Sequence, residues 1–280
     1  MIKLTPKQIR KKILELLPED KVVSCHNEKG HFYSVDGGPA YPSVTGKLQI
    51  LKDESIINFK MNRAIDYIYQ YWPKFTEVNV MEHLELASRA SADIFEDAGD
   101  IGSEIHDYRA EYFDDWILTG KRPQNILSYI PSAQEDIRAI SALRALKKFI
   151  DDYEYVPIAS ELKVYSHKLE VAGTLDDIGM IKINGKKKLL LLDIKTSNQF
   201  KDHYFFQVAL YYVMFYQLTG IRPDKVFILK LSKKDGTYQL EDLKRPSVLA
   251  TYTKAMIRVN EGLEYIKSLR RDNQKNVIKL

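Results

Sequence analysis

The sequence predicts a mainly helical N-terminal portion, residues 1–150, followed by an α/β portion, residues 151–280. Apolar residues recur at helical spacing through most of residues 45–150. The main strand-like runs appear after Pro157, and a strongly apolar helical segment lies between them. No flexible linker separates the two portions, so they can pack as one unit.

The composition is that of an ordinary soluble protein. The chain has 280 residues, of which 45% are apolar and 29% charged, so it can form one large domain or two small ones. No stretch is apolar enough to cross a bilayer, and the N-terminus lacks the pattern of a signal peptide. The single cysteine, Cys25, excludes a disulfide framework, a cysteine zinc site and an iron–sulfur cluster within one chain. We therefore expect no membrane partner and a cytoplasmic location.

The N-terminal portion is expected to begin with an amphipathic helix over residues 5–17, in which Ile9 and Ile13 lie on one face. Residues 21–36 alternate in polarity and predict a hairpin, which a turn-rich stretch follows. The helical pattern of residues 45–150 breaks near Trp72–Pro73 and again at 120–132.

The C-terminal portion contains four strand-like runs, at 159–166, 170–183, 188–196 and 225–232. An apolar helix is expected over about 202–218, and Gly220 fits its C-terminal end. A last helix is expected over about 246–270. The formal net charge of +4 is mild and does not by itself indicate nucleic-acid binding.

The most informative segment is the hairpin expected around Asn184-Gly185, a dipeptide that favours a type I′ turn. If these two residues form the loop, Asp176 lies directly opposite Asp193 on one face of the sheet. Lys195 is two residues further along and shares that face. Two opposed carboxylates repel each other, and one of them should take up a proton.

The flanks of these polar residues are apolar, with four leucines at 189–192 and then Ile194. Such a run predicts a central strand covered on both faces, where two acids and a lysine pack poorly. A divalent cation between the two acids would explain why they occur there, because Mg²⁺ prefers oxygen ligands. Mn²⁺ is the alternative metal. Lys195 would orient the attacking water or offset charge on the phosphate. The alternative is a surface hairpin with an ordinary Asp–Lys pair.

Four short motifs follow one another in order along the chain: Gly102-Ser-Glu-Ile-His106, Gly173-Thr-Leu-Asp176, Asp193-Ile-Lys195-Thr196 and Gln207-Val-Ala-Leu-Tyr211. Their order resembles the PD-(D/E)XK nuclease superfamily, and within it the RecB-type exonuclease branch. Tyr41-Pro-Ser-Val-Thr45 further resembles single-strand exonucleases typified by the mitochondrial genome maintenance exonuclease and its phage relatives. The resemblance covers about residues 100 to 216. At the position of the Pro-Asp motif of the superfamily, this chain has Gly173-Thr-Leu-Asp176.

The resemblance implies a restriction-endonuclease-like core, in which helices flank a mixed central sheet. It implies that His106, Asp176 and Asp193 bind the metal, together with the backbone carbonyl of Ile194. Lys195 would be the catalytic lysine. Glu161, which is expected to open the preceding strand, would support Lys195 or a second metal.

Gln207 and Tyr211 are four residues apart, so they share one helix face, which the resemblance places toward the catalytic strand and the DNA. Each of these residues also has an ordinary interpretation. His106 could be a core histidine, and Gln207 and Tyr211 could serve packing alone. Thr196 and Ser197 could bind a phosphate or begin a turn.

Together these features predict a metal-dependent exonuclease that hydrolyses DNA, acting on single strands or free ends in repair or recombination. If the chain is encoded by a phage, the expected location is the host cytoplasm. Two alternatives stay open: an endonuclease of the same fold, and a non-catalytic DNA-binding or recombination module. The helical N-terminal portion could form an arch that threads a free strand.

Overall fold

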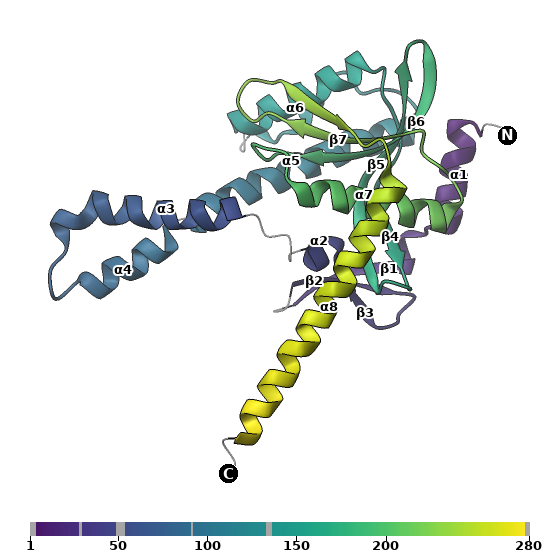
Figure 1. Ribbon diagram of the computed structural model, residues 1–280. Helices are drawn as coiled ribbons and strands as arrows, with labels where there is room; N and C mark the ends of the chain where they lie inside the picture. Colours follow the sequence, from purple (N-terminus) through teal and green to yellow (C-terminus); the bar gives the residue numbers. More distant parts are fainter. Residues whose placement is uncertain (1–3, 28–29, 49–53, 91, 133–135, 278–280) are drawn as a thin grey trace.

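The structure is a computed structural model that describes residues 4–27, 30–48, 54–90, 92–132 and 136–277. The first helix, α1 (Pro6–Leu16), begins at a Thr5 capping box and buries Ile9 and Ile13, as its amphipathic pattern predicts. It lies beside the central sheet and helix α7 (Figure 1).

A small antiparallel sheet of three strands follows α1. It comprises β1 (Val22–Asn27), β2 (Gly30–Val35) and β3 (Ala40–Pro42) in that order. The hairpin expected at 21–36 is therefore confirmed. The turn-rich stretch after it also contributes the third strand and the short helix α2 (Val44–Lys47), neither of which the sequence pattern indicated.

Four longer helices complete the N-terminal portion: α3 (Glu54–Tyr71), α4 (Val80–Arg89), α5 (Ala92–Thr119) and α6 (Ile137–Asp152). The two breaks occur where they are expected, at the short turns Trp72–Lys74 and Ile126–Tyr129. Helices α3 and α4 form a hairpin that projects away from the central sheet (Figure 1).

The central sheet has the order β4-β5-β6-β7-β8. Its strands are β4 (Val156–Ser166), β5 (Val171–Ile183), β6 (Lys186–Lys195), β7 (Lys225–Leu231) and β8 (Tyr238–Asp242). Strands β6 and β7 are parallel and are joined through α7 (Asp202–Thr219), whereas the other pairs are antiparallel. The expectation of a mixed sheet flanked by helices is confirmed, and β8 is an additional edge strand.

Strand β6 is buried on both faces, as its leucine run predicts. Leu189 and Leu191 belong to the core shared with α1 and α7. Leu190, Leu192 and Ile194 belong to a second core, formed with α5 and α6. Because successive side chains of a strand point to opposite faces, Asp193 and Lys195 follow the face of Leu191, toward α7.

The last helix, α8 (Pro246–Val277), packs against α7 near its start and then projects from the body of the protein (Figure 1). It is longer than the segment 246–270 expected from sequence. Among the described residues, no helix has both the length and the apolar character that a membrane span requires.

Candidate metal and catalytic site

The β5–β6 hairpin has the register that its turn predicts. Asn184 and Gly185 have φ values of 50° and 74°, and regular pairing runs from Ile183↔Lys186 to Asp177↔Leu192. The next step of this register would pair Asp176 with Asp193, and regular pairing ends there. Instead, the backbone N–H of Ile194 donates a hydrogen bond of 2.6 Å to Asp176 Oδ2. Asp176 and Asp193 therefore lie just beyond the last regular pair between β5 and β6, where the carboxylate of Asp176 takes the place of a backbone acceptor.

Asp193 lies in an almost fully buried ion pair. Its Oδ2 is 2.7 Å from Lys195 Nζ, and its side chain is 1% exposed. No described residue other than Lys195 offers a hydrogen-bond donor to either carboxylate oxygen of Asp193. Burial, with repulsion from Asp176, raises the pKa of Asp193 to about 7, although Lys195 opposes the shift.

Lys195 is a charged group at this position. Burial opposes its charge, but Asp193 and Asp176 outweigh burial and raise its pKa above the usual value. Its ammonium also lies 5.1 Å from the centroid of the Tyr204 ring on α7. The side chain is therefore held as an ammonium at the end of β6, between a carboxylate and an aromatic face.

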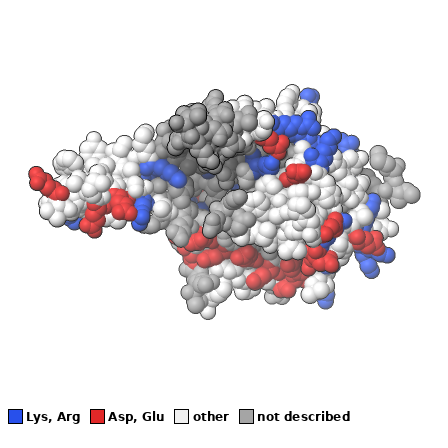
Figure 2. Space-filling model, turned by 90° about the horizontal axis from the view of Figure 1, so that it is seen from below, with Lys and Arg blue, Asp and Glu red and all other residues white. Residues whose placement is uncertain are grey.

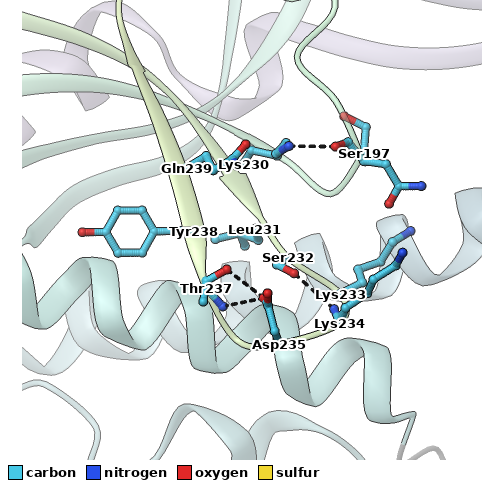
Figure 3. Close-up of a pocket in the computed structure, with 11 residues that line it drawn as sticks. Ser197, Lys230, Leu231, Ser232, Lys233, Lys234, Asp235, Thr237, Tyr238 and Gln239 are labelled. Carbon is cyan, nitrogen blue, oxygen red and sulfur yellow. Dashed lines mark hydrogen bonds between the residues drawn. The ribbon is translucent and has the colours of Figure 1, made fainter.

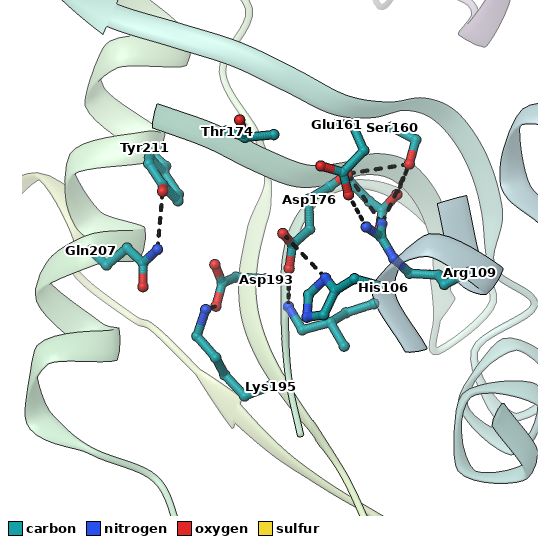
Figure 4. Close-up of polar contacts among 12 residues, drawn as sticks. His106, Arg109, Ser160, Glu161, Thr174, Asp176, Asp193, Lys195, Gln207 and Tyr211 are labelled. Carbon is teal, nitrogen blue, oxygen red and sulfur yellow. Dashed lines mark hydrogen bonds and ion pairs between the residues drawn. The ribbon is translucent and has the colours of Figure 1, made fainter. Parts of the chain in front are cut away.

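A second cluster forms where α5, β4 and β5 meet. One ligand atom each from His106, Glu161 and Asp176 lies within 4.8 Å of the others, so this group could hold a metal ion. His106 Nδ1 is 3.9 Å from Asp176 Oδ1. Burial lowers the pKa of His106 to about 4, which leaves the imidazole neutral and able to coordinate a cation. Figure 4 shows His106, Asp176, Asp193 and Lys195 around one shared space.

The grouping differs in one respect from the expected ligands. Glu161 lies with His106 and Asp176, whereas Asp193 is engaged by Lys195. Ile194 contacts both sides of the site through its backbone, by its hydrogen bond to Asp176 and by a backbone interaction with His106. The physical reason is that Lys195 is two residues after Asp193 on the same face of β6, which brings its ammonium to 2.7 Å from Asp193 Oδ2.

Helix α5 approaches the β5–β6 hairpin closely because of Gly102. A Cβ atom added there would lie 3.1 Å from Thr196 Oγ1, just past the end of β6. Gly102 is four residues before His106 and so lies on the same helix face. The missing side chain at Gly102 thus allows His106 to reach the ends of β5 and β6.

The expectation that Glu161 opens its strand is wrong, because β4 already begins at Val156. It lies in the interior of the strand with a φ of 50°, a left-handed conformation that is uncommon for a residue with a side chain. Neighbouring residues Ser160 and Leu162 pair regularly with β5, so the irregularity is confined to Glu161. This local distortion accompanies the approach of its carboxylate to His106 and Asp176, and such distortions cluster at functional sites.

Arg109 is a residue of the site that the sequence interpretation missed. It is fully buried, its Nη1 lies 2.5 Å from Asp177 Oδ2, and it also forms an ion pair with Glu161. It donates a further hydrogen bond of 3.3 Å to the backbone carbonyl of Asp176. Burial raises the pKa of Asp177 to about 6, and Arg109 opposes this shift. Arg109 therefore ties three acidic residues of β4 and β5 to helix α5.

A signal for Arg109 was present in the sequence. It follows His106 by three residues and so shares its helix face, yet Ile105, Tyr112 and Phe113 around it are apolar. A charged residue on an apolar helix face needs a buried partner. The adjacent acids at 176 and 177 supply that partner, but only the tertiary structure shows which of the two is used.

Gln207 and Tyr211 are joined on α7, where Gln207 Nε2 donates a 3.0 Å hydrogen bond to the Tyr211 hydroxyl. Both residues are buried and lie on the side of the hairpin that carries Asp193 (Figure 4). Tyr211 packs over Gly173, where an added Cβ atom would lie 2.8 Å from the ring. The glycine of the Gly173–Asp176 motif thus makes room for the tyrosine of the α7 motif.

The chemistry of these residues fits a divalent cation. Carboxylate oxygens and a neutral imidazole are available at one place. Asp193 Oδ1 has no hydrogen-bond donor among the described residues, and Oδ2 has the Lys195 ammonium alone. A buried carboxylate oxygen without a donor is costly, and coordination of a cation would remove that cost.

Comparisons with known proteins give distant likenesses only. No family model and no curated protein matches the chain. Among solved structures, an alkaline exonuclease (LHK-Exo) from Laribacter hongkongensis is 16% identical over 60% of this chain and 86% of its own, with a TM-score of 0.32. A protein named SSO0001 is 15% identical over 59% and 74% of the two chains, with a TM-score of 0.26. These likenesses do not assign a family to this chain.

Proposed function

We propose that this protein is a metal-dependent DNA exonuclease that hydrolyses phosphodiester bonds, acting on single-stranded DNA or on DNA ends. The observation that supports this most is the convergence of Asp176, Asp193 and Lys195 at the end of one hairpin. Two acids and an ammonium on two adjacent buried strands stabilise the fold poorly, because each charge loses its hydration there. Such an arrangement is expected where the charges serve catalysis.

In this proposal, Mg²⁺ or Mn²⁺ is held by His106, Asp176 and Asp193, with the carbonyl of Ile194. Glu161 adds a fifth donor or serves a second ion, because its carboxylate lies within reach of His106 and Asp176. A bound cation would polarise a phosphoryl oxygen and lower the pKa of a bound water. The neutral state of His106 suits this role, since a protonated ring cannot coordinate a metal.

The remaining residues act on the substrate directly. The Lys195 ammonium offsets the negative charge that develops on the phosphate, and Asp193 fixes the position of that ammonium. Gln207 holds the Tyr211 hydroxyl through a hydrogen bond. Together they form a polar pair on α7 that can contact the DNA next to the catalytic strand.

A time course with end-labelled single-stranded and duplex DNA, across a titration of Mg²⁺ or Mn²⁺, tests the proposal. We expect progressive shortening from an end that requires the metal and stops when a chelator removes it. DNA binding without product at any metal concentration would instead support a non-catalytic DNA-binding module. Discrete internal cuts in duplex DNA by a dimeric protein would support an endonuclease of the same fold.

A further inference from the structure

A second polar cavity lies next to the hairpin that carries the catalytic residues. Its volume is about 280 Å³, and it opens between the loop after β6 and the β7–β8 hairpin (Figure 3). Ser197 and Asn198 line it on one side, and the ends of β7 and β8 with their turn, residues 230–235 and 237–239, line the other. The catalytic site described above uses none of these residues.

The cavity is connected to the catalytic strand through Lys230. In the parallel β6–β7 pair, Lys230 is the register partner of Lys195, so both side chains leave the sheet on the same face. Lys230 Nζ donates a 2.7 Å hydrogen bond to the carbonyl of Asn198 and lies 5.3 Å from the Phe200 ring centroid. A strand of DNA that reaches Lys195 therefore has this cavity directly beside it.

The cavity carries excess positive charge. Among the described residues, no carboxylate forms an ion pair with Lys230, Lys233 or Lys234. Figure 3 shows the side chains of Lys233 and Lys234 running beside each other toward the side of Ser197. Burial and the nearby Arg138 lower the pKa of Lys233, and these effects outweigh those of Asp97 and Asp136, which act in the opposite direction.

Asp235 is the acidic residue of the lining, and its carboxylate is already engaged. The backbone N–H and the hydroxyl of Thr237 donate to Asp235 Oδ1 at 3.1 and 2.7 Å. Side-chain hydrogen bonding by Ser232 and Thr237 lowers the pKa of Asp235 to about 2. This carboxylate therefore stabilises the turn and does not pair with the lysines. Asp97 and Asp136 act on Lys233 only at longer range, so the ammonium groups of the lining stay available to an anion.

The β7–β8 turn is fixed in place, so the lysines are presented on a defined frame. Gly236 has a φ of 66°, and a Cβ atom added there would contact Cβ of Arg144 on α6 at 3.4 Å. At the base of the turn, Ser232 N–H donates to the Thr237 carbonyl at 2.9 Å. Tyr238 donates a 2.7 Å hydrogen bond from its hydroxyl to Asp152. Such preorganisation lowers the entropic cost of binding a ligand.

We propose that this cavity binds the phosphate backbone of the DNA strand next to the bond that is cut. The proposal rests on the proposed nuclease function, because that function brings a polyanion to Lys195. Lys233 and Lys234 supply the charge that attracts phosphate oxygens, at the end of the sheet where Ser197 and Ser232 also line the cavity. The cavity thus positions the strand and makes no base-specific contact.

The salt dependence of DNA binding tests this proposal. The variant pair Lys233→Gln and Lys234→Gln is compared with Lys186→Gln and Lys187→Gln, which removes equal charge at the opposite end of β6. Every protein also carries Lys195→Ala to block cleavage. The probe is a fluorescent 20-nucleotide thymidine oligomer, whose affinity is measured between 50 and 300 mM salt. Thermal melting of each variant establishes that it is folded.

Two lost phosphate contacts should reduce the slope of log K against log salt by about 1.4, since each contact to a single strand contributes about 0.7. If the affinities converge at 1 M salt, this slope corresponds to about 25-fold weaker binding at 0.1 M. We expect the Lys186 and Lys187 control to keep the parental slope. An unchanged slope in the Lys233 and Lys234 variant, or an equal loss in the control, would overturn the proposal.

The same experiment separates this proposal from the proposed function. If the protein cleaves DNA but the Lys233 and Lys234 variant binds like its parent, the phosphate site is wrong and the nuclease stands. If that variant alone loses affinity but the wild-type protein cleaves no DNA with any metal, the phosphate site stands and the nuclease is wrong. Absence of all oligomer binding would overturn both.

Discussion

Lys195 keeps its charge inside the protein because Asp193 and Asp176 outweigh the effect of burial on its pKa. If this ammonium acts on the phosphate, Lys195→Ala should lower the cleavage rate by about 10²–10³-fold, as for loss of one preorganised electrostatic group. Affinity for single-stranded DNA should stay within a few-fold. Rates at saturating DNA measure the first effect, and Lys187→Ala at the far end of β6 is the control. Cleavage by Lys195→Ala at the wild-type rate would contradict the assignment.

Asp193 should make the metal-free protein less stable as the pH rises. Its pKa is about 7 in the folded protein, above the value of about 3.9 in an unfolded chain. Between these two pKa values, the Asp193 carboxyl is therefore protonated in the folded protein and ionised in the unfolded chain. This bound proton stabilises the folded state, and the stabilisation is lost as the pH rises through 7. We expect the melting temperature to fall from pH 5 to pH 8 in chelator, and Mn²⁺ to restore it at pH 8.

The matched variant for this experiment is Asp193→Asn, which has no carboxylate to ionise. Its melting temperature should depend less on pH than that of the wild type, and Mn²⁺ should stabilise it less at pH 8. His106 works in the opposite direction, because its lowered pKa favours stability at higher pH. A wild-type melting temperature that rises steadily from pH 5 to pH 8 in chelator would show that the Asp193 carboxylate is not the dominant group.

Arg109 should contribute to stability through the buried acid that it neutralises. Arg109→Met leaves Asp177 buried without its cation, and breaking such a pair costs about 3–5 kcal/mol in the free energy of unfolding. Arg122→Met breaks the partly exposed pair with Asp151 and should cost about 0–1 kcal/mol. Urea unfolding compares the two. Adding Asp177→Leu to Arg109→Met should recover part of the lost stability. If no stability is recovered, the loss comes from the packing of the Arg109 side chain and not from the unpaired Asp177 carboxylate.

At the scale of elements, one glycine allows the β5–β6 hairpin and helix α7 to pack closely against each other. Gly173→Ala places a Cβ atom 2.8 Å from the Tyr211 ring, which is buried and hydrogen-bonded to Gln207, so the ring cannot shift freely. Overpacking of this kind costs about 1–3 kcal/mol. Gly99→Ala is the control, because its Cβ would meet nothing within 4 Å on helix α5. It should stabilise the protein slightly, since alanine favours a helix more than glycine.

Chemical denaturation of both glycine variants gives the required free energies. DNA cleavage by Gly173→Ala should also fall, because Tyr211 lies on the side of the hairpin that carries Asp193 (Figure 4). A Gly173→Ala protein as stable as Gly99→Ala would mean that the contact with Tyr211 is relaxed at no cost.

The extents of the main strands and helices of the C-terminal portion could largely be predicted, because their patterns are local. The expected strand at 188–196 is β6, and the expected helix at 202–218 is α7. Strand β8 was not predicted, because its side chains are partly exposed and it carries two acids in five residues. Its place at the edge of the sheet comes from pairing with β7, which is a tertiary contact.

For the whole molecule, the projecting α3–α4 hairpin suggests how a free strand could be selected. If this hairpin forms an arch through which DNA is threaded, a closed circle of single-stranded DNA should resist cleavage, while the same sequence in linear form is degraded. The rates on the two forms should differ by at least about tenfold, a difference of about 1.4 kcal/mol in activation free energy. Efficient cutting of the circle would remove the threading proposal and leave the metal chemistry intact.

The sequence by itself determined the hairpin at Asn184-Gly185 and therefore which residues lie at the end that carries Asp176, Asp193 and Lys195. This was possible because turn chemistry and the period of two in a strand are local properties. Only the tertiary structure decided that Glu161 joins His106 and Asp176, and that Arg109 neutralises Asp177. These pairings join α5 to β4 and β5 across more than fifty residues, and a buried charge takes whichever partner packing brings within reach.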